Sequence, residues 1–236
     1  METVSAVLSE LKTKGSEQTR KIFAKHGAPE SMFGVKVADM KVIAKKIKGN
    51  QELALELYDC GNSDAMYLAG MVADGSQMSK KQLDQWAKDA SWSMIAEYTV
   101  PGVTCENDSA RDIAMKWIKS KTETVAAAGW CTYSGILATR NDDDIDFAEV
   151  EALLDKIESE ITEAKNRVRY TMNGFVISVG GYVKALNKRA KLTAKKIGVV
   201  NCDVGETACK VPLASEYILK IEKSGKLGKK RKTIKC

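Results

Sequence analysis

The sequence is poor in several residue types that define common protein classes. It contains three prolines and one histidine among 236 residues, and its six cysteines include no C-x-x-C pair. A zinc site built on cysteine and histidine is therefore not expected. No apolar run approaches the roughly 18 residues that cross a bilayer, and the N-terminus lacks a signal-peptide pattern. These absences predict a cytoplasmic protein with reduced thiols, no metal and no membrane partner.

Positive charge is abundant but unevenly distributed. Residues 1–163 hold 19 Lys/Arg and 27 Asp/Glu, a net charge of −8, whereas residues 164–236 hold 18 and 4, a net charge of +14. The sum is the overall charge of +6. A cationic block of this size favours a polyanionic partner such as DNA or RNA.

The spacing of apolar residues predicts helices. Met40, Ile43, Ala44 and Ile47 recur at i, i+3, i+4 and i+7, which is the pattern of an amphipathic helix. Turn residues interrupt such segments often, so we expect about a dozen helices of about 10 to 18 residues joined by short loops. The fold class predicted is an all-α superhelical solenoid of antiparallel HEAT-like helix pairs, with a compact helical bundle as the alternative.

The last third of the sequence contains two cationic segments. No acidic residue lies between Glu163 and Asp203, so we expect a charged face without internal ion pairs. The residues predicted to contact phosphates are Arg167, Arg169, Lys184, Lys188, Arg189, Lys191 and Lys195. Residues 223–236 carry seven basic residues and no acid. The domain division is therefore a helical domain over 1–222 and a flexible basic tail over 223–236.

Four short motifs resemble the DNA alkylation repair enzyme family. The segment Phe33–Lys45 (FGVKVADMKVIAK) is similar to an aromatic-Gly-Val signature near the start of that family, with Ala38 in place of Pro and Lys41 in place of Arg. The three later elements lie at Ala90-Ser-Trp92, Gly129-Trp130 and Asn173-Gly-Phe175. The resemblance covers roughly residues 3–222.

The resemblance implies a cationic concave face that cradles duplex DNA and excision of N3- or N7-alkylated purines without metal or cofactor. Such a lesion is already a cationic leaving group, so a carboxylate flanked by aromatic rings would suit the chemistry. The family's carboxylate position falls on Ala96. Glu97 is the candidate catalytic residue, provided that the helical register there differs, because one residue rotates a helical side chain by about 100°. The candidate lesion-contacting residues are Trp92, Trp130, Tyr133 and Phe175.

Three functions are compatible with these features. The first is a monomeric DNA N-glycosylase for alkylated purines, which binds duplex DNA through its phosphate backbone. The second is a non-catalytic relative that binds DNA or structured RNA, which the absence of a carboxylate at position 96 favours. The third is a scaffold that holds a protein partner along a concave face.

Overall fold

The computed structural model describes residues 3–235, and its secondary structure in that range is entirely helical. Local sequence explains where several helices begin. Ser79 caps its helix by accepting the Gln82 N–H, and the Gln82 side chain bonds back to Ser79 in a capping box. The α-helices are α1 (Val4–Lys14), α2 (Glu17–Lys25), α3 (Val37–Lys46), α4 (Gln51–Asp59), α5 (Ser63–Val72), α6 (Lys80–Asp89), α7 (Val100–Thr104), α8 (Ala110–Ile118), α9 (Glu123–Thr139), α10 (Phe147–Glu160), α11 (Asn166–Tyr182), α12 (Asn187–Ile197) and α13 (Ala214–Lys223).

Four short helical turns complete the secondary structure. Three are 3₁₀ turns: η1 (Gly75–Gln77), η3 (Asp142–Asp144) and η4 (Lys184–Leu186). The fourth, η2 (Ile95–Thr99), is a π-helical turn that runs directly into α7. The predicted all-α class is confirmed.

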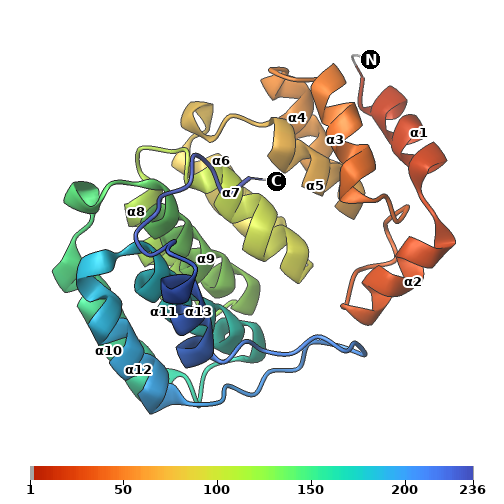
Figure 1. The fold of residues 1–236 in the computed structure, drawn as a ribbon. Helices are drawn as coiled ribbons and strands as arrows, with labels where there is room; N and C mark the ends of the chain where they lie inside the picture. The colour runs from red at the N-terminus through yellow and green to blue at the C-terminus, as the bar shows by residue number, and fades with distance from the viewer. Residues whose placement is uncertain (1–2, 236) are drawn as a thin grey trace.

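The helices follow one another in an arc of antiparallel pairs (Figure 1). Helices α5, η2–α7, α9 and α11 are the inner members of successive pairs, and their side chains line the hollows of the concave side. None of the helices in residues 3–235 is long and apolar enough to cross a membrane.

Two hydrophobic cores support the arc. The N-terminal core gathers side chains from α1 to α6 and η2, and it includes the stacked rings of Tyr58 and Trp86, whose centroids are 3.8 Å apart. The C-terminal core gathers side chains from α8 to α13. Helices α8 and α9 contribute to both cores, as Trp117 and Trp130 show. This shared pair holds the two halves of the concave side at a set distance.

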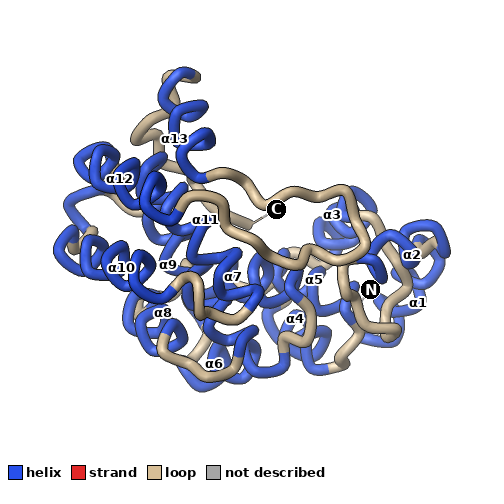
Figure 2. Tube along the Cα trace, turned by 90° about the horizontal axis from the view of Figure 1, so that it is seen from below, coloured by secondary structure: helices blue, strands red, loops and turns tan. Residues whose placement is uncertain are grey.

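Two non-helical segments cross the concave side. The loop of residues 198–213 runs from the end of α12 toward α2 (Figures 1 and 2), where the Glu206 N–H donates to the Lys25 carbonyl at 3.0 Å. The second segment, residues 226–235, follows α13 and ends near the centre of the arc. We call residues 226–235 the C-terminal strap.

The strap differs from the flexible tail expected from sequence. Its Gly228 and Arg231 backbone N–H groups donate to the carbonyls of Gly181 and Ala138, at 2.8 and 2.7 Å. Ile234 and Lys235 line small hollows against η2 and α5. Composition suggested a free arm because the segment is basic and rich in glycine, but the inner helices supply backbone acceptors that the sequence does not reveal.

Candidate DNA-binding groove and carboxylate site

The concave side contains a cleft of about 580 Å³ between α2, η2, α11 and the 198–213 loop. Aromatic side chains from four elements line it, together with His26, Asn166 and Arg167. The aromatic residues are Phe23, Tyr67, Trp92, Tyr98 and Tyr170. Ser93 and Asp203 also line the cleft. A cleft with several ring faces, and with polar groups that can bond to a ligand's edge, is suited to a flat aromatic ligand such as a nucleobase.

Glu97 lines a smaller neighbouring hollow that shares Trp92 and Arg167 with this cleft, and its side chain is 3% exposed. Arg167 of α11 holds it with two parallel bonds, from Nε to Oε1 at 2.7 Å and from Nη2 to Oε2 at 2.6 Å. Burial raises the pKa of Glu97, and the hydrogen bonds and charge of Arg167 oppose that rise. The Arg167 guanidinium also lies over the Tyr170 ring, 4.3 Å from its centroid. The ion pair therefore joins the inner helices of the two cores.

The π turn decides where Glu97 lies. The Val100 N–H donates to the Ile95 carbonyl, five residues earlier, so the turn holds one residue more than an α-helical turn. A role for Glu97 depended on a helical register different from that of a regular α-helix, and Glu97 lies within this π turn. Ala96, the position expected for the carboxylate, is an apolar residue of the N-terminal core.

The structure separates the four residues predicted to touch a lesion. Trp92 lines the cleft, with its indole N–H donating to the His26 carbonyl at 3.0 Å and its ring 5.5 Å from that of Phe23. Trp130 and Phe175 are instead fully buried and pack edge to face at 5.2 Å. Tyr133 is also buried, and its hydroxyl lies 2.5 Å from Glu149 of α10. A lesion-contacting role for Trp130, Tyr133 and Phe175 is therefore corrected to a role in the C-terminal core.

Most of the aromatic residues that line the cleft were not predicted from the sequence; only Trp92 was. Tyr98 is 57% exposed and follows Glu97 directly, which was the one available signal. Tyr67, Tyr170 and Phe23 are distant from it in sequence and had no signal of this kind. Arg167 was expected to bind phosphate, but it is the partner of Glu97.

The expectation of a cationic face without ion pairs is also corrected. Arg189 pairs with Asp155 and Glu158 of α10, and Lys191 pairs with Glu222 of α13. The acidic partners of this stretch lie on neighbouring helices, and a count of charges along the sequence cannot show such pairs. Arg169 is partly buried, and its Nε has no hydrogen-bond partner among the described residues.

The predicted phosphate contacts that remain available are Lys184, Lys188 and Lys195. All three are exposed, and they form no ion pair within residues 3–235. A Cβ on Gly228 of the strap would lie 3.5 Å from the Lys184 Cβ, so Lys184 adjoins the strap. We call Lys184, Lys188, Lys226 and Lys229 the cationic edge.

Comparison with known proteins agrees with this architecture. The sequence profile of the DNA alkylation repair enzyme family matches residues 7–191. The chain belongs to this family. The described residues contain no group of three or more His, Cys, Asp or Glu side chains arranged to hold a metal ion.

One solved structure shares this fold over its whole length. A solved structure from "a new family of proteins related to the HEAT-like repeat DNA glycosylases with affinity for branched DNA structures" superposes with a TM-score of 0.92 and 38% identity, covering 99% of this chain and 100% of that one. The likeness confirms the HEAT-like solenoid. Two uncharacterized proteins, Lin0241 of Listeria innocua and Lmo0209 of Listeria monocytogenes, are 34% and 33% identical over 226 residues, covering 93% of this chain and 97% of each relative.

Proposed function

We propose that this protein binds DNA along its concave side and prefers branched DNA to a continuous duplex. The observation that carries the proposal is the cationic edge, whose lysines form no ion pair in the part of the chain that the structure describes. Unpaired cations gain most from phosphates, because each contact releases counterions condensed on the DNA. The solved relative with affinity for branched DNA supports the same function.

The two segments that cross the concave side favour branched DNA. The 198–213 loop and the strap run across the inner helices (Figure 2), and residues of the loop line the aromatic cleft while residues of the strap line a hollow against α9 and α11. A continuous duplex is stiff, with a persistence length of about 50 nm, and it would meet these segments before it reached the inner helices. At a branch point the strands separate and bend sharply, so individual strands can follow the spaces beside the segments.

Fluorescence anisotropy tests this function. A four-way junction and a linear duplex of the same arm sequence are titrated with the protein at about 50 mM salt and at rising salt concentrations. We expect the junction to bind more tightly, with an affinity that falls steeply with salt. Absence of binding, or binding that salt does not weaken, would refute the proposal, and equal affinity for the two DNAs would refute the preference.

Base excision is a second candidate function, favoured by one observation. Glu97, in the π turn, lines one hollow together with Trp92 and a second together with Tyr98, and a carboxylate near aromatic rings would suit stabilisation of an oxocarbenium-like transition state. Each carboxylate oxygen already accepts one bond from Arg167, however, and the side chain is only 3% exposed, so a water must reach the remaining lone pairs of a buried, ion-paired group.

Release of the methylated base from an N7-methylguanine duplex tests the second candidate. If the protein is a glycosylase, release should be measurable and Glu97→Gln should abolish it. Trp92→Phe, which keeps an aromatic ring in the cleft, should retain part of the activity. Tight DNA binding without base release would leave a non-catalytic DNA-binding function.

A further inference from the structure

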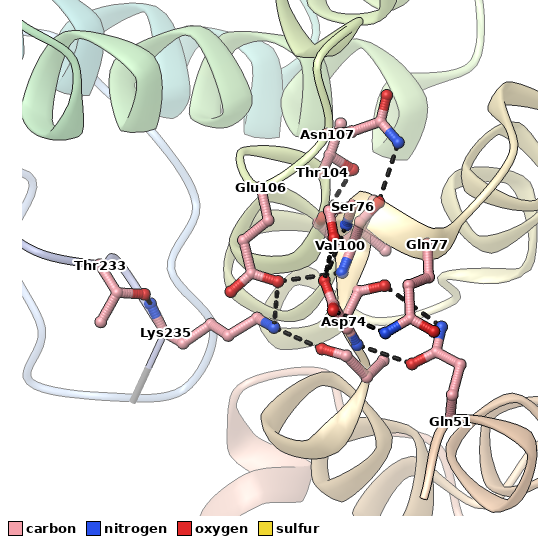
Figure 3. Close-up of polar contacts among 12 residues, drawn as sticks. Gln51, Asp74, Ser76, Gln77, Val100, Thr104, Glu106, Asn107, Thr233 and Lys235 are labelled. Carbon is pink, nitrogen blue, oxygen red and sulfur yellow. Dashed lines mark hydrogen bonds and ion pairs between the residues drawn. The ribbon is translucent and has the colours of Figure 1, made fainter. Parts of the chain in front are cut away.

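The strap is fixed to the rim of the groove at its far end. The Lys235 ammonium lies 2.6 Å from Glu106 Oε2 and also donates to the Ala73 carbonyl (Figure 3). Glu106 is itself held by the Gly75 N–H at 3.0 Å. The neighbouring Asp74 is hydrogen-bonded to Ser76 and Gln77. The strap therefore ends in a site whose acceptors are already positioned by other contacts.

The inner helices are shaped to receive the strap. A Cβ on Gly135 of α9 would lie 2.5 Å from the Ile234 Cδ1, and a Cβ on Gly102 of α7 would lie 3.3 Å from the Lys235 Cγ. Glycine lets the strap approach these helices more closely than any other residue would. The backbone bond from Gly228 to Gly181 holds the other end. Contacts at both ends and a fitted middle indicate that the docked position is part of the fold.

The basic residues of the strap divide into two sets. Lys230 and Lys235 are the less exposed basic residues, and they pair with Asp142 of η3 and with Glu106, which follows α7. Lys229, Arg231 and Lys232 are exposed, and no side-chain partner for them occurs within residues 3–235. The two paired lysines neutralise acids that would repel DNA, while the three exposed residues present positive charge.

We propose that the docked strap is itself a phosphate-binding surface, on which Lys229, Arg231 and Lys232 contact the backbone of a DNA strand. This inference rests on the DNA-binding function proposed above. The alternative is that the strap blocks the groove and must leave before DNA binds. A blocking segment that imitates DNA would present negative charge, whereas this segment presents three cations: Lys229, which already belongs to the cationic edge, and Arg231 and Lys232, which add to its positive field.

A triple variant tests the inference: Lys229→Ala, Arg231→Ala and Lys232→Ala. The control triple variant removes the same charge from α3 and the turn that follows it, with Lys41→Ala, Lys45→Ala and Lys48→Ala, three exposed lysines in the N-terminal half of the chain. Junction binding is measured by anisotropy across a range of salt concentrations. We expect the strap variant to reduce the slope of log affinity against log salt by about 2 to 3, and the control to leave the slope unchanged.

A second variant tests whether the strap must be docked. Lys235→Met removes the anchoring charge and keeps the three exposed cations. We expect faster hydrogen exchange at the Gly228 and Arg231 amides and weaker junction binding. The strap lies outside both hydrophobic cores, so we expect each variant to keep the helical fold. Circular dichroism checks this.

The outcomes separate this inference from the DNA-binding function. If the unaltered protein does not bind the junction, the proposed function fails. If it binds and the strap variant binds equally well, only the inference fails. Tighter binding by either the strap variant or Lys235→Met would also overturn the inference, because it would show that the docked strap obstructs DNA.

Discussion

The two hydrophobic cores hold acidic side chains in different ways. In the N-terminal core, Asp64 is 1% exposed and accepts the backbone N–H groups of Phe33, Gly34 and Val35, at 2.5, 3.0 and 3.0 Å. Beside the C-terminal core, the partly buried Glu158 of α10 instead accepts hydrogen bonds from side chains, those of Arg189, Lys196 and Thr193. Glu97 and Arg167 form the corresponding pair between the two cores.

The two kinds of acid have different consequences: one orders the backbone, and the other neutralises lysine and arginine side chains that could otherwise bind phosphate. Asp64 orders the loop that contains the Phe33-Gly-Val signature, and it does so through backbone N–H groups instead of a lysine or arginine. Glu158 and Glu222 each engage cations of α12, so they determine how much of its charge remains for a phosphate. The lysines and arginines that remain able to bind phosphate are those with no acidic side chain beside them.

The largest expected effect concerns Asp64. Asp64→Ala would leave three N–H groups without their acceptor, and we expect the free energy of unfolding to fall by about 3–5 kcal/mol. Chemical denaturation measures the loss. Asp59→Ala, at an exposed position of α4, is the matched control and should change stability by less than about 0.5 kcal/mol. Equal effects of the two variants would contradict the structural role of Asp64.

The second-largest effect on stability is expected for the Glu97–Arg167 ion pair between the two cores. Arg167→Ala leaves Glu97 buried without its partner, and we expect a loss of about 3 kcal/mol at neutral pH. Burial then raises the pKa of Glu97 without opposition from Arg167. A carboxyl whose pKa is higher in the folded state binds a proton more readily there, so the variant should regain stability as the pH falls.

Thermal unfolding of Arg167→Ala at pH 5 and pH 8 measures this dependence. The double variant Arg167→Ala with Glu97→Gln removes the uncompensated charge and should lose the extra sensitivity to pH. A similar pH dependence in the single and double variants would show that Glu97 is not its source.

A smaller effect is expected at Glu158. Burial raises its pKa, but hydrogen bonds from Lys196, Arg189 and Thr193 outweigh that effect and lower the pKa to about 2, from 4.5. The stabilisation is therefore complete above about pH 5 and lost as the pH falls toward 2. Glu158→Gln should cost about 1–2 kcal/mol at pH 7 and flatten the acid limb of the stability profile. Glu151→Gln, on the exposed face of α10, is the control and should leave that limb unchanged.

The smallest effect contrasts two glycines of α11. A Cβ on Gly174 would meet nothing within 4 Å, so Gly174→Ala should stabilise the protein by about 0.5–1 kcal/mol. A Cβ on Gly180 would lie 2.6 Å from the Ile218 Cδ1 of α13, so Gly180→Ala should destabilise it. Melting temperatures compare the two directly. The same sign for both would mean that α13 does not pack on Gly180 as described.

Local sequence patterns predicted the helices well because their causes are local. The repeat of Met40, Ile43 and Ile47 places three buried residues on one face of α3 and its C-terminal end, as the structure shows. The capping box at Ser79 depends on residues three apart. Trp130 and Phe175 show the limit, because an aromatic residue on an apolar face fits a core and a ligand site equally well.

The sequence by itself determined an all-α protein with a charge imbalance toward its last third and the motifs of its family. The tertiary structure alone decided which of those charges are free, that the basic tail is a docked strap, and that a π turn brings Glu97 to Arg167. The physical reason is distance along the chain. Helix periodicity and capping act over three or four residues, whereas Arg189 meets Glu158 across 31 positions and Lys235 meets Glu106 across 129.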